Sequence, residues 1–199
     1  MSLKNRNRIQ AVLDLATAAD YAEGKAWYAR ALTAAQRLTE DYDITVKTAA
    51  GVITALSPRN KWDRNLLDAE KIISVYVSAG ADEALNVKVC TFTANKKKAI
   101  AILKSEGIHT EDILYILKGP KMIEFYSCIV GLNDVCIDGH AYSIWLGERV
   151  ALQDVPAIGV KLRREIKEDY IKVAAKNNLA SYELQAITWV CWRRLHGVA

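Results

Sequence analysis

The stretch Val135-Cys136-Ile137-Asp138-Gly139-His140 places one carboxylate between an apolar run and the start of an expected helix. Aspartate often caps a helix N-terminus, because its side chain accepts hydrogen bonds from the free amides of the first turn. The apolar residues before Asp138 are expected to bury its surroundings. Upstream, the turn Leu117-Lys118-Gly119-Pro120-Lys121 carries two lysines ahead of another expected helix. Two neighbouring turns therefore offer a carboxylate and an amine.

The apolar periodicity is helical along nearly the whole chain, because apolar residues recur three and four positions apart. About ten helices with short connections are expected, and these define an all-α fold. One segment, Asp82–Thr93, alternates weakly and is expected to be an extended loop. The expected helices cover roughly residues 9–16, 28–38, 46–56, 62–78, 95–105, 110–117, 121–130, 138–149, 162–173 and 181–195.

Breakers and caps mark the ends of these helices. Ser57-Pro58 stops the helix over 46–56, because proline lacks an amide hydrogen and restricts the residue before it. Gly80 is expected to end the helix over 62–78. Thr93 or Asn95 is expected to cap the next helix, and Ser181 to cap the last one. We expect a single domain over residues 1–199, made of two intimate helical lobes.

Composition limits the function classes. A chain of 199 residues can bury a sizeable core, and its net charge of +4 permits a polyanionic partner without requiring one. No secretory signal and no run of about 18 apolar residues is present, so no membrane partner is expected. The spacing of the histidines and cysteines predicts no zinc site and no iron–sulfur cluster. A reduced, cytoplasmic compartment is the simplest reading of the scattered cysteines, which are Cys90, Cys128, Cys136 and Cys191.

Together these landmarks resemble the helix-hairpin-helix superfamily of DNA glycosylases, which has the endonuclease III-like fold. Gly51–Asn60 looks like the family's DNA-contacting loop, residues 117–123 occupy the position of its hairpin, and Val135–His140 looks like the segment bearing its catalytic aspartate. The family hairpin usually contains two glycines that bring backbone amides onto a phosphate, whereas this one has Gly119 alone. The chain also resembles short phage-encoded members, through three elements: Ser57-Pro58, Trp62-Asp63-Arg64-Asn65 and Glu183-Leu184-Gln185-Ala186-Ile187-Thr188-Trp189. For a phage-encoded protein the compartment is the host cytoplasm.

The resemblance implies two catalytic residues. Cleavage of an N-glycosidic bond develops positive charge on the deoxyribose, and the carboxylate of Asp138 would stabilise that charge in a water-poor pocket. Lys121 would attack the sugar C1′ and form a Schiff base, which adds a lyase step. Plainer readings stand beside these: Asp138 as an N-cap, which is compatible with catalysis, and Lys121 as a solvated or phosphate-contacting lysine.

The resemblance also implies a DNA-binding surface. An enzyme that acts on a base extracts it from the stack and can fill the vacancy with a side chain, here Arg59 or Asn60. Trp62 is read either as a wedge or as core, and His140 either as a phosphate contact or as a packing residue. The runs 96–98 and 193–194 are read as solvated charges, with nonspecific attraction to phosphates as the alternative. The expected DNA-binding residues are Ser57, Arg59, Asn60, Lys61, Trp62, Lys118, Gly119 and His140.

The resulting expectation is a monomeric DNA glycosylase, with or without a lyase step, that binds double-stranded DNA and needs no cofactor. Two rivals remain open. One is a catalytically inactive DNA-binding module of the same fold. The other is a helical protein-interaction factor, for which loss of all DNA binding at low salt would be evidence.

Overall fold

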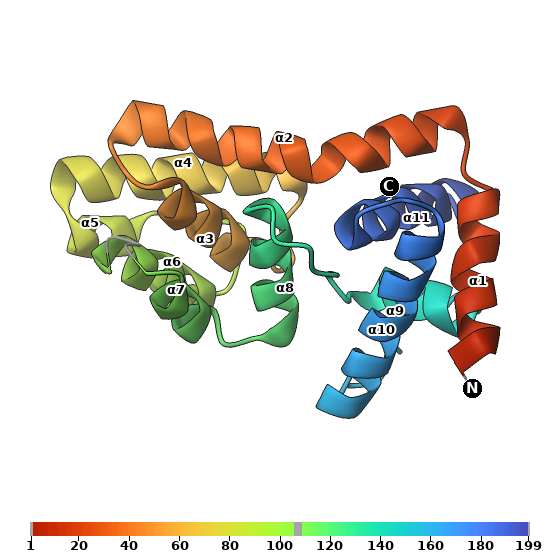
Figure 1. Ribbon diagram of the computed structural model, residues 1–199. Helices are drawn as coiled ribbons and strands as arrows, with labels where there is room; N and C mark the ends of the chain where they lie inside the picture. The colour runs from red at the N-terminus through yellow and green to blue at the C-terminus, as the bar shows by residue number, and fades with distance from the viewer. Residues whose placement is uncertain (1, 106–108, 199) are drawn as a thin grey trace. The chain divides into compact units, whose positions relative to one another are not determined.

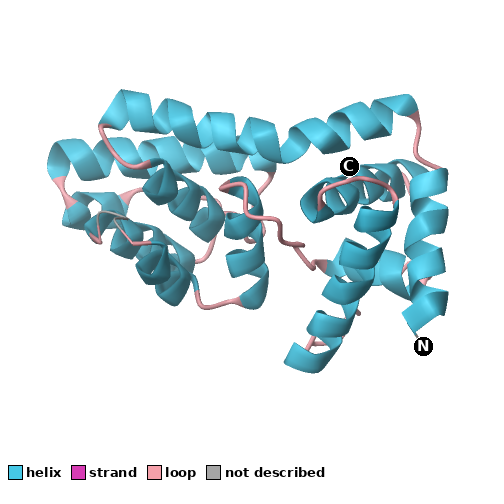
Figure 2. Ribbon diagram, in the orientation of Figure 1, coloured by secondary structure: helices cyan, strands magenta, loops and turns pink. Residues whose placement is uncertain are grey.

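A computed structural model describes residues 2–105 and 109–198. Over these residues the chain is built from α-helices joined by loops and turns, without a strand (Figures 1 and 2). The all-α prediction is therefore confirmed. The helices of the described residues are α1 (Ser2–Asp14), α2 (Ala18–Tyr42), α3 (Val46–Leu56), α4 (Trp62–Ala79), α5 (Ala81–Asn86), α6 (Thr93–Lys104), α7 (Thr110–Leu117), α8 (Pro120–Ile129), α9 (Gly139–Leu146), α10 (Val160–Lys176) and α11 (Ser181–Leu195).

The chain divides into two compact units. Unit 1 combines residues 1–29 with 131–199, and unit 2 comprises residues 30–130. The first boundary falls within α2 and the second directly after α8. Of the expected catalytic residues, Asp138 therefore belongs to unit 1 and Lys121 to unit 2. The sequence-based prediction of one domain with two intimate lobes stays a prediction.

Unit 1 has its own apolar core, to which α1, α9, α10 and α11 each contribute one face. Ile9, Ile144, Tyr170 and Ile187 are completely buried in this core. The first part of α2 approaches α11 closely at Gly24, where a Cβ atom would lie only 2.5 Å from the Cα atom of Ile187. Only a residue without a side chain fits this contact.

Unit 2 is organised around α3, which is buried on all sides from Thr48 to Leu56. A helix that is apolar all round belongs in an interior rather than at a surface. Thr45 caps its N-terminus by accepting a hydrogen bond from the amide of Thr48 at 3.1 Å. A Cβ atom at Gly51 would lie 3.0 Å from the Ile113 side chain and 3.1 Å from that of Ile102, so this glycine permits close packing of α6 and α7.

The structure changes several predicted helix ends. Residues 82–86, expected to be extended, belong to the short helix α5 (Ala81–Asn86), whereas 87–92 are not helical. Phe92, rather than Thr93 or Asn95, occupies the N-cap of α6. Ala180, rather than Ser181, occupies the N-cap of α11, where its amide donates to the Glu183 carboxylate. These polar residues lie one or more positions inside their helices, because the chain enters each helix earlier than side-chain chemistry suggests. Gly107, which the sequence places between the expected helices over 95–105 and 110–117, lies outside the described residues.

The start of α2 contains an acidic residue whose charge stabilises unit 1. Asp20 exchanges hydrogen bonds with Thr17 at the N-terminus of α2, and its carboxylate also accepts three bonds from Arg194, the shortest at 2.8 Å. The Arg194 guanidinium holds the pKa of Asp20 below its ordinary value of 3.8.

We expect Asp20→Asn to lower the free energy of unfolding at neutral pH by on the order of 1 kcal/mol, since the Arg194 side of the pair is exposed to solvent. A lowered folded-state pKa means that this stabilisation is present above the unfolded-state pKa. It is lost as the pH falls below about 4, because the carboxylate then becomes protonated. Urea unfolding of both proteins at several pH values should show their difference shrinking toward acid pH. A difference that does not change with pH would contradict the role of the charge.

Candidate nucleic-acid interface and carboxylate site

The turn between α7 and α8 forms a tight helical hairpin in unit 2. Only Lys118 and Gly119 separate the two helices, and Pro120 is the first residue of α8, a position that needs no amide hydrogen. Lys118 has a φ of +58°, whereas Gly119 has an ordinary φ of −81°. The strained backbone position therefore carries a lysine, and the glycine adopts a conformation open to any residue.

The amides of this hairpin are partly used by the hairpin itself. The amide of Gly119 donates to the carbonyl of Leu117 at 2.7 Å, and the amide of Lys118 donates to that of Leu114 at 3.1 Å. A phosphate would therefore meet lysine side chains more readily than a pair of free hairpin amides. The ammonium group of Lys118 lies over the ring of Tyr115, 5.0 Å from its centre, and this ring is 74% exposed.

The other lysines near the hairpin have different surroundings. Lys121 is exposed in the first turn of α8. Lys98 reaches back from α6 to donate to the Leu117 carbonyl at 2.6 Å, and Lys96 donates to the Val87 carbonyl at 2.9 Å. The reading of residues 96–98 as plain solvated charges is therefore wrong for these two residues, because their ammonium groups satisfy carbonyls at the ends of α7 and α5. Lys97 is exposed.

The predicted DNA-contacting turn joins α3 to α4 and separates its polar residues into two groups. Ser57 and Asn60 are half-buried and bond the end of α3: the Ser57 hydroxyl donates to the Thr54 carbonyl at 2.8 Å, and Asn60 Nδ2 lies 3.4 Å from the Leu56 carbonyl. Arg59 is exposed with a φ of +57°, and Lys61 is exposed beside it. Arg59 is thus the better candidate of the pair Arg59 and Asn60 for insertion into DNA.

Trp62 begins α4 and is half-buried. Three residues later, the buried Asn65 donates from Nδ2 to the Ile53 carbonyl at 2.9 Å. The end of α3 would otherwise leave buried carbonyls without partners, which is costly away from water. In the Trp62-x-x-Asn65 element, the asparagine therefore satisfies a buried carbonyl near the end of α3, the central helix of unit 2.

Asp138 is the N-cap of α9 in unit 1, as expected from the sequence. Its Oδ1 atom accepts a hydrogen bond from the amide of Ala141 at 2.8 Å, and the side chain is half-buried. A carboxylate at this position also interacts favourably with the positive end of the helix dipole. The residue before it, Ile137, is buried. The Ala141 amide therefore holds the Asp138 carboxylate in a fixed orientation through Oδ1.

The surroundings of Asp138 combine a buried phenol with a guanidinium. Arg163 of α10 donates to the carbonyl of Ile137 at 3.1 Å. Burial raises the pKa of Tyr170 far above its usual range, and the negative charge of Asp138 adds to this effect. The Tyr170 hydroxyl, 3.4 Å from the Ala141 carbonyl, therefore stays protonated. Gly139 is close-packed, since a Cβ atom there would lie 2.7 Å from the Leu152 side chain.

His140 is the second residue of α9 and faces an aromatic group. Its ring meets that of Trp189 edge-on, with ring centres 6.5 Å apart. Trp189 also lies 5.1 Å from the ring of Trp27 and 4.2 Å from the guanidinium carbon of Arg193. These four side chains form a half-buried aromatic and cationic cluster in unit 1. The packing reading of His140 has a structural basis, while its contact with DNA stays a prediction.

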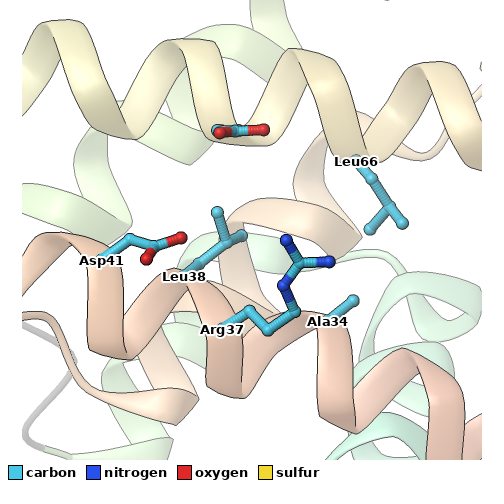
Figure 3. A pocket seen from close by; sticks show the side chains of 6 residues that line it. Ala34, Arg37, Leu38, Asp41 and Leu66 are labelled. Carbon is cyan, nitrogen blue, oxygen red and sulfur yellow. The ribbon is translucent and has the colours of Figure 1, made fainter.

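A separate hollow lies between α2 and α4 in unit 2. Figure 3 shows Arg37, Leu38 and Asp41 of α2 on one side and Leu66 of α4 on the other. Its volume is about 90 Å³, below the roughly 300 Å³ at which ligand pockets usually begin. None of the expected site residues lines it, and we assign it no ligand. Among residues 2–105 and 109–198, no three His, Cys, Asp or Glu side chains gather as a metal site.

Sequence reasoning missed three residues beside the expected sites. Asp68 is buried next to the α3–α4 turn, Phe92 lies against Arg59, and Tyr115 lies under Lys118. Asp68 carried one usable signal, because it follows Arg64 by four residues on the helix face that also carries buried apolar residues. The two aromatic residues carried none, since exposed and buried rings look alike in a sequence.

These features define an all-helical protein with a lysine-bearing hairpin and a carboxylate at a helix N-terminus. The chain belongs to DUF7178, a family of unknown function that matches it over residues 2–196. No curated protein and no solved structure matches the chain. In the described part of the chain, no helix has both the length and the apolar character needed to cross a membrane.

Proposed function

We propose that this chain is a DNA-binding protein of the helix-hairpin-helix glycosylase type, with the endonuclease III-like fold, that excises a base from duplex DNA. The observation that carries the proposal is the α7–Lys118–Gly119–α8 hairpin, followed along the chain by a half-buried aspartate at the N-cap of α9. This is the order of elements that the resemblance implies. The exposed cations at the hairpin and at the α3–α4 turn suit a phosphate backbone.

In the proposed reaction the duplex binds through phosphate contacts and one nucleotide is turned out of the stack. The Asp138 carboxylate then stabilises the positive charge that develops on the deoxyribose as the N-glycosidic bond breaks. Water adds to C1′ of this cation, and the proton that it releases balances the one taken up by the departing base. Its cap bond to Ala141 holds the carboxylate in place before the reaction begins. Burial keeps Tyr170 neutral, so it adds no second negative charge near Asp138.

Lys121 supports the lyase step less well than the binding step. An amine nucleophile needs a substantial unprotonated fraction, which proteins usually obtain by removing the lysine from water. Lys121 is exposed at the N-terminal turn of α8. We therefore assign it to phosphate contact and propose excision without an obligatory Schiff base. Borohydride trapping on an abasic duplex tests this assignment: a trapped complex that disappears in Lys121→Ala would restore the lyase step.

A non-catalytic DNA-binding protein is the second candidate. It is favoured by the cap bond of Asp138, which alone accounts for an aspartate at that position. Both candidates require retention on duplex DNA that weakens steeply as salt is raised. Measured affinity for a random duplex over a range of salt concentrations tests this shared step. Failure to bind at low salt would contradict both candidates and favour the protein-interaction rival.

The hairpin offers a matched pair of variants, because its left-handed residue is also a cation. We expect Lys118→Gly to raise the free energy of unfolding by about 1 kcal/mol, since glycine adopts a positive φ without steric cost. Lys118→Ala removes the same charge but keeps the strain, so it should give no such gain. In both variants the slope of the logarithm of the binding constant against the logarithm of the salt concentration should become shallower by about one, the contribution of one phosphate contact. Unchanged salt dependence in both would remove Lys118 from the interface.

A further inference from the structure

One buried carboxylate ties two surface segments of unit 2 together. The side chain of Asp68, a residue that is 1% exposed, accepts a hydrogen bond from Asn60 Nδ2 at 3.0 Å and from the backbone amide of Cys90 at 2.7 Å. Arg64 Nε donates to its other oxygen at 2.8 Å. Asn60 belongs to the α3–α4 turn, and Cys90 belongs to the segment 87–92 between α5 and α6. The two segments are therefore linked through the interior.

A second link lies nearer the surface. The Thr91 hydroxyl donates to the Pro58 carbonyl at 3.0 Å, and Asn95 Nδ2 donates to the Thr91 hydroxyl at 3.1 Å. Beyond these bonds, the Arg59 guanidinium lies over the ring of Phe92, 5.2 Å from its centre. We call Arg59 and Phe92 the tip.

The tip is unusual for a surface. Phe92 is 51% exposed, although phenylalanine is normally buried, and Arg59 is exposed with a left-handed backbone. The nearby turn and segment add the exposed cations Lys61 and Lys88, against one exposed acid, Asp63 in the first turn of α4. A flat apolar ring and a planar cation beside lysines suit unstacked bases flanked by phosphates.

We propose that Asp68 is a positioning residue that holds the tip in place for insertion into duplex DNA where a nucleotide has been turned out. The proposal rests on the proposed function, to which it adds the second segment and the buried carboxylate. Without the Asp68 charge, the amide of Cys90 and the side chain of Asn60 lose a strong acceptor, so each segment can relax separately. The surrounding structure then no longer holds the Arg59 backbone at its strained positive φ, and the side chain can leave the Phe92 ring.

The test uses the full chain and a duplex with a tetrahydrofuran abasic analogue, which presents a vacated stack. Arg59→Ala and Phe92→Ala should each weaken binding to this duplex by about fivefold to a hundredfold, the range for loss of one stacking contact. Their unfolding temperatures should equal that of the parent protein. Arg37→Ala, which removes an exposed arginine of α2 in the same unit, is the matched control and should have a smaller effect.

Asp68→Asn keeps the size of the side chain and removes its charge. It should weaken binding to a similar degree, but it should add little when combined with Arg59→Ala and Phe92→Ala, because it acts through them. Cys90 is exposed and the other three cysteines are buried, so reaction with a thiol reagent reports on segment 87–92 directly. Asp68→Asn should speed this reaction in the folded protein, whereas Arg59→Ala should not.

The outcomes distinguish the tip from the proposed function. If the parent protein binds the duplex and the tip variants bind equally well, the insertion of the tip into DNA is wrong and the proposed function stands. If the parent protein binds no duplex at low salt, the proposed function fails and the tip fails with it. The positioning role would be overturned if Asp68→Asn weakened DNA binding by its full factor even in the protein that already carries Arg59→Ala and Phe92→Ala. It would also be overturned if Asp68→Asn left the reactivity of Cys90 unchanged.

Discussion

Asp138→Asn is expected to lower the rate of base excision by about a hundredfold or more, with only a small drop in unfolding temperature from the lost charge at the helix N-terminus. Asparagine caps helices as well as aspartate does, so its side-chain oxygen can still accept the bond from Ala141. Only the negative charge is lost. The rate is measured with excess protein over substrate, so that binding and product release do not limit it.

Asp138→Ala is the companion variant. It removes both the charge and the cap, so it should match the asparagine variant in activity and also lose about 1 kcal/mol of stability. Equal activity of the parent and Asp138→Asn would show that the residue is a cap and nothing more. In that case the proposed catalytic role of Asp138 would be wrong.

Gly24→Ala is expected to give the largest loss of stability from a single methyl group. Alanine normally stabilises a helix by up to about 1 kcal/mol relative to glycine, so helix propensity alone predicts a gain. At this position the new Cβ atom would lie 2.5 Å from the Cα atom and 2.6 Å from the backbone nitrogen of Ile187, so α2 and α11 must separate. Overpacking of this kind costs about 1–3 kcal/mol, and here backbone rather than a flexible side chain must move.

Chemical unfolding of Gly24→Ala should therefore show a net loss of about 2 kcal/mol. Lys25→Ala, at the next and exposed position of α2, is the control for changes in helix propensity and should have little effect. A stabilised Gly24→Ala protein would contradict the close approach of α2 and α11 within unit 1.

The helical fold was predictable because apolar periodicity and helix breakers act locally. Gly80 ends α4 and Asp138 caps α9, as their residue types suggest. The last helix shows where this local reasoning ends: Leu184, Ile187 and Cys191 are buried, but Leu195 on the same stripe is 44% exposed. Whether the apolar face of a helix is buried along its whole length depends on which other elements pack against it, and no local sequence pattern contains that information.

The candidate site was predictable in its segments but not in its contacts. Arg59 and Asn60 are adjacent in the sequence, yet one projects and the other bonds to a buried carboxylate eight positions away. Lysines 96 and 98 look like surface charge, yet they satisfy carbonyls of α5 and α7. These distinctions depend on which helix ends meet in the fold. For that reason the bonds of Asp68 to Asn60 and Cys90, on which the further inference rests, could not be predicted from the sequence, although its spacing from Arg64 was visible there.

The most direct test of base excision works whichever base is the substrate. The parent protein and Asp138→Asn are incubated in excess with long duplex DNA, either untreated or separately alkylated, oxidised and deaminated, and free bases in the filtrate are measured by mass spectrometry. We expect at least one preparation to release a free base with the parent protein and far less with the variant. No released base from any preparation, by a parent protein that binds the same DNA, would contradict base excision.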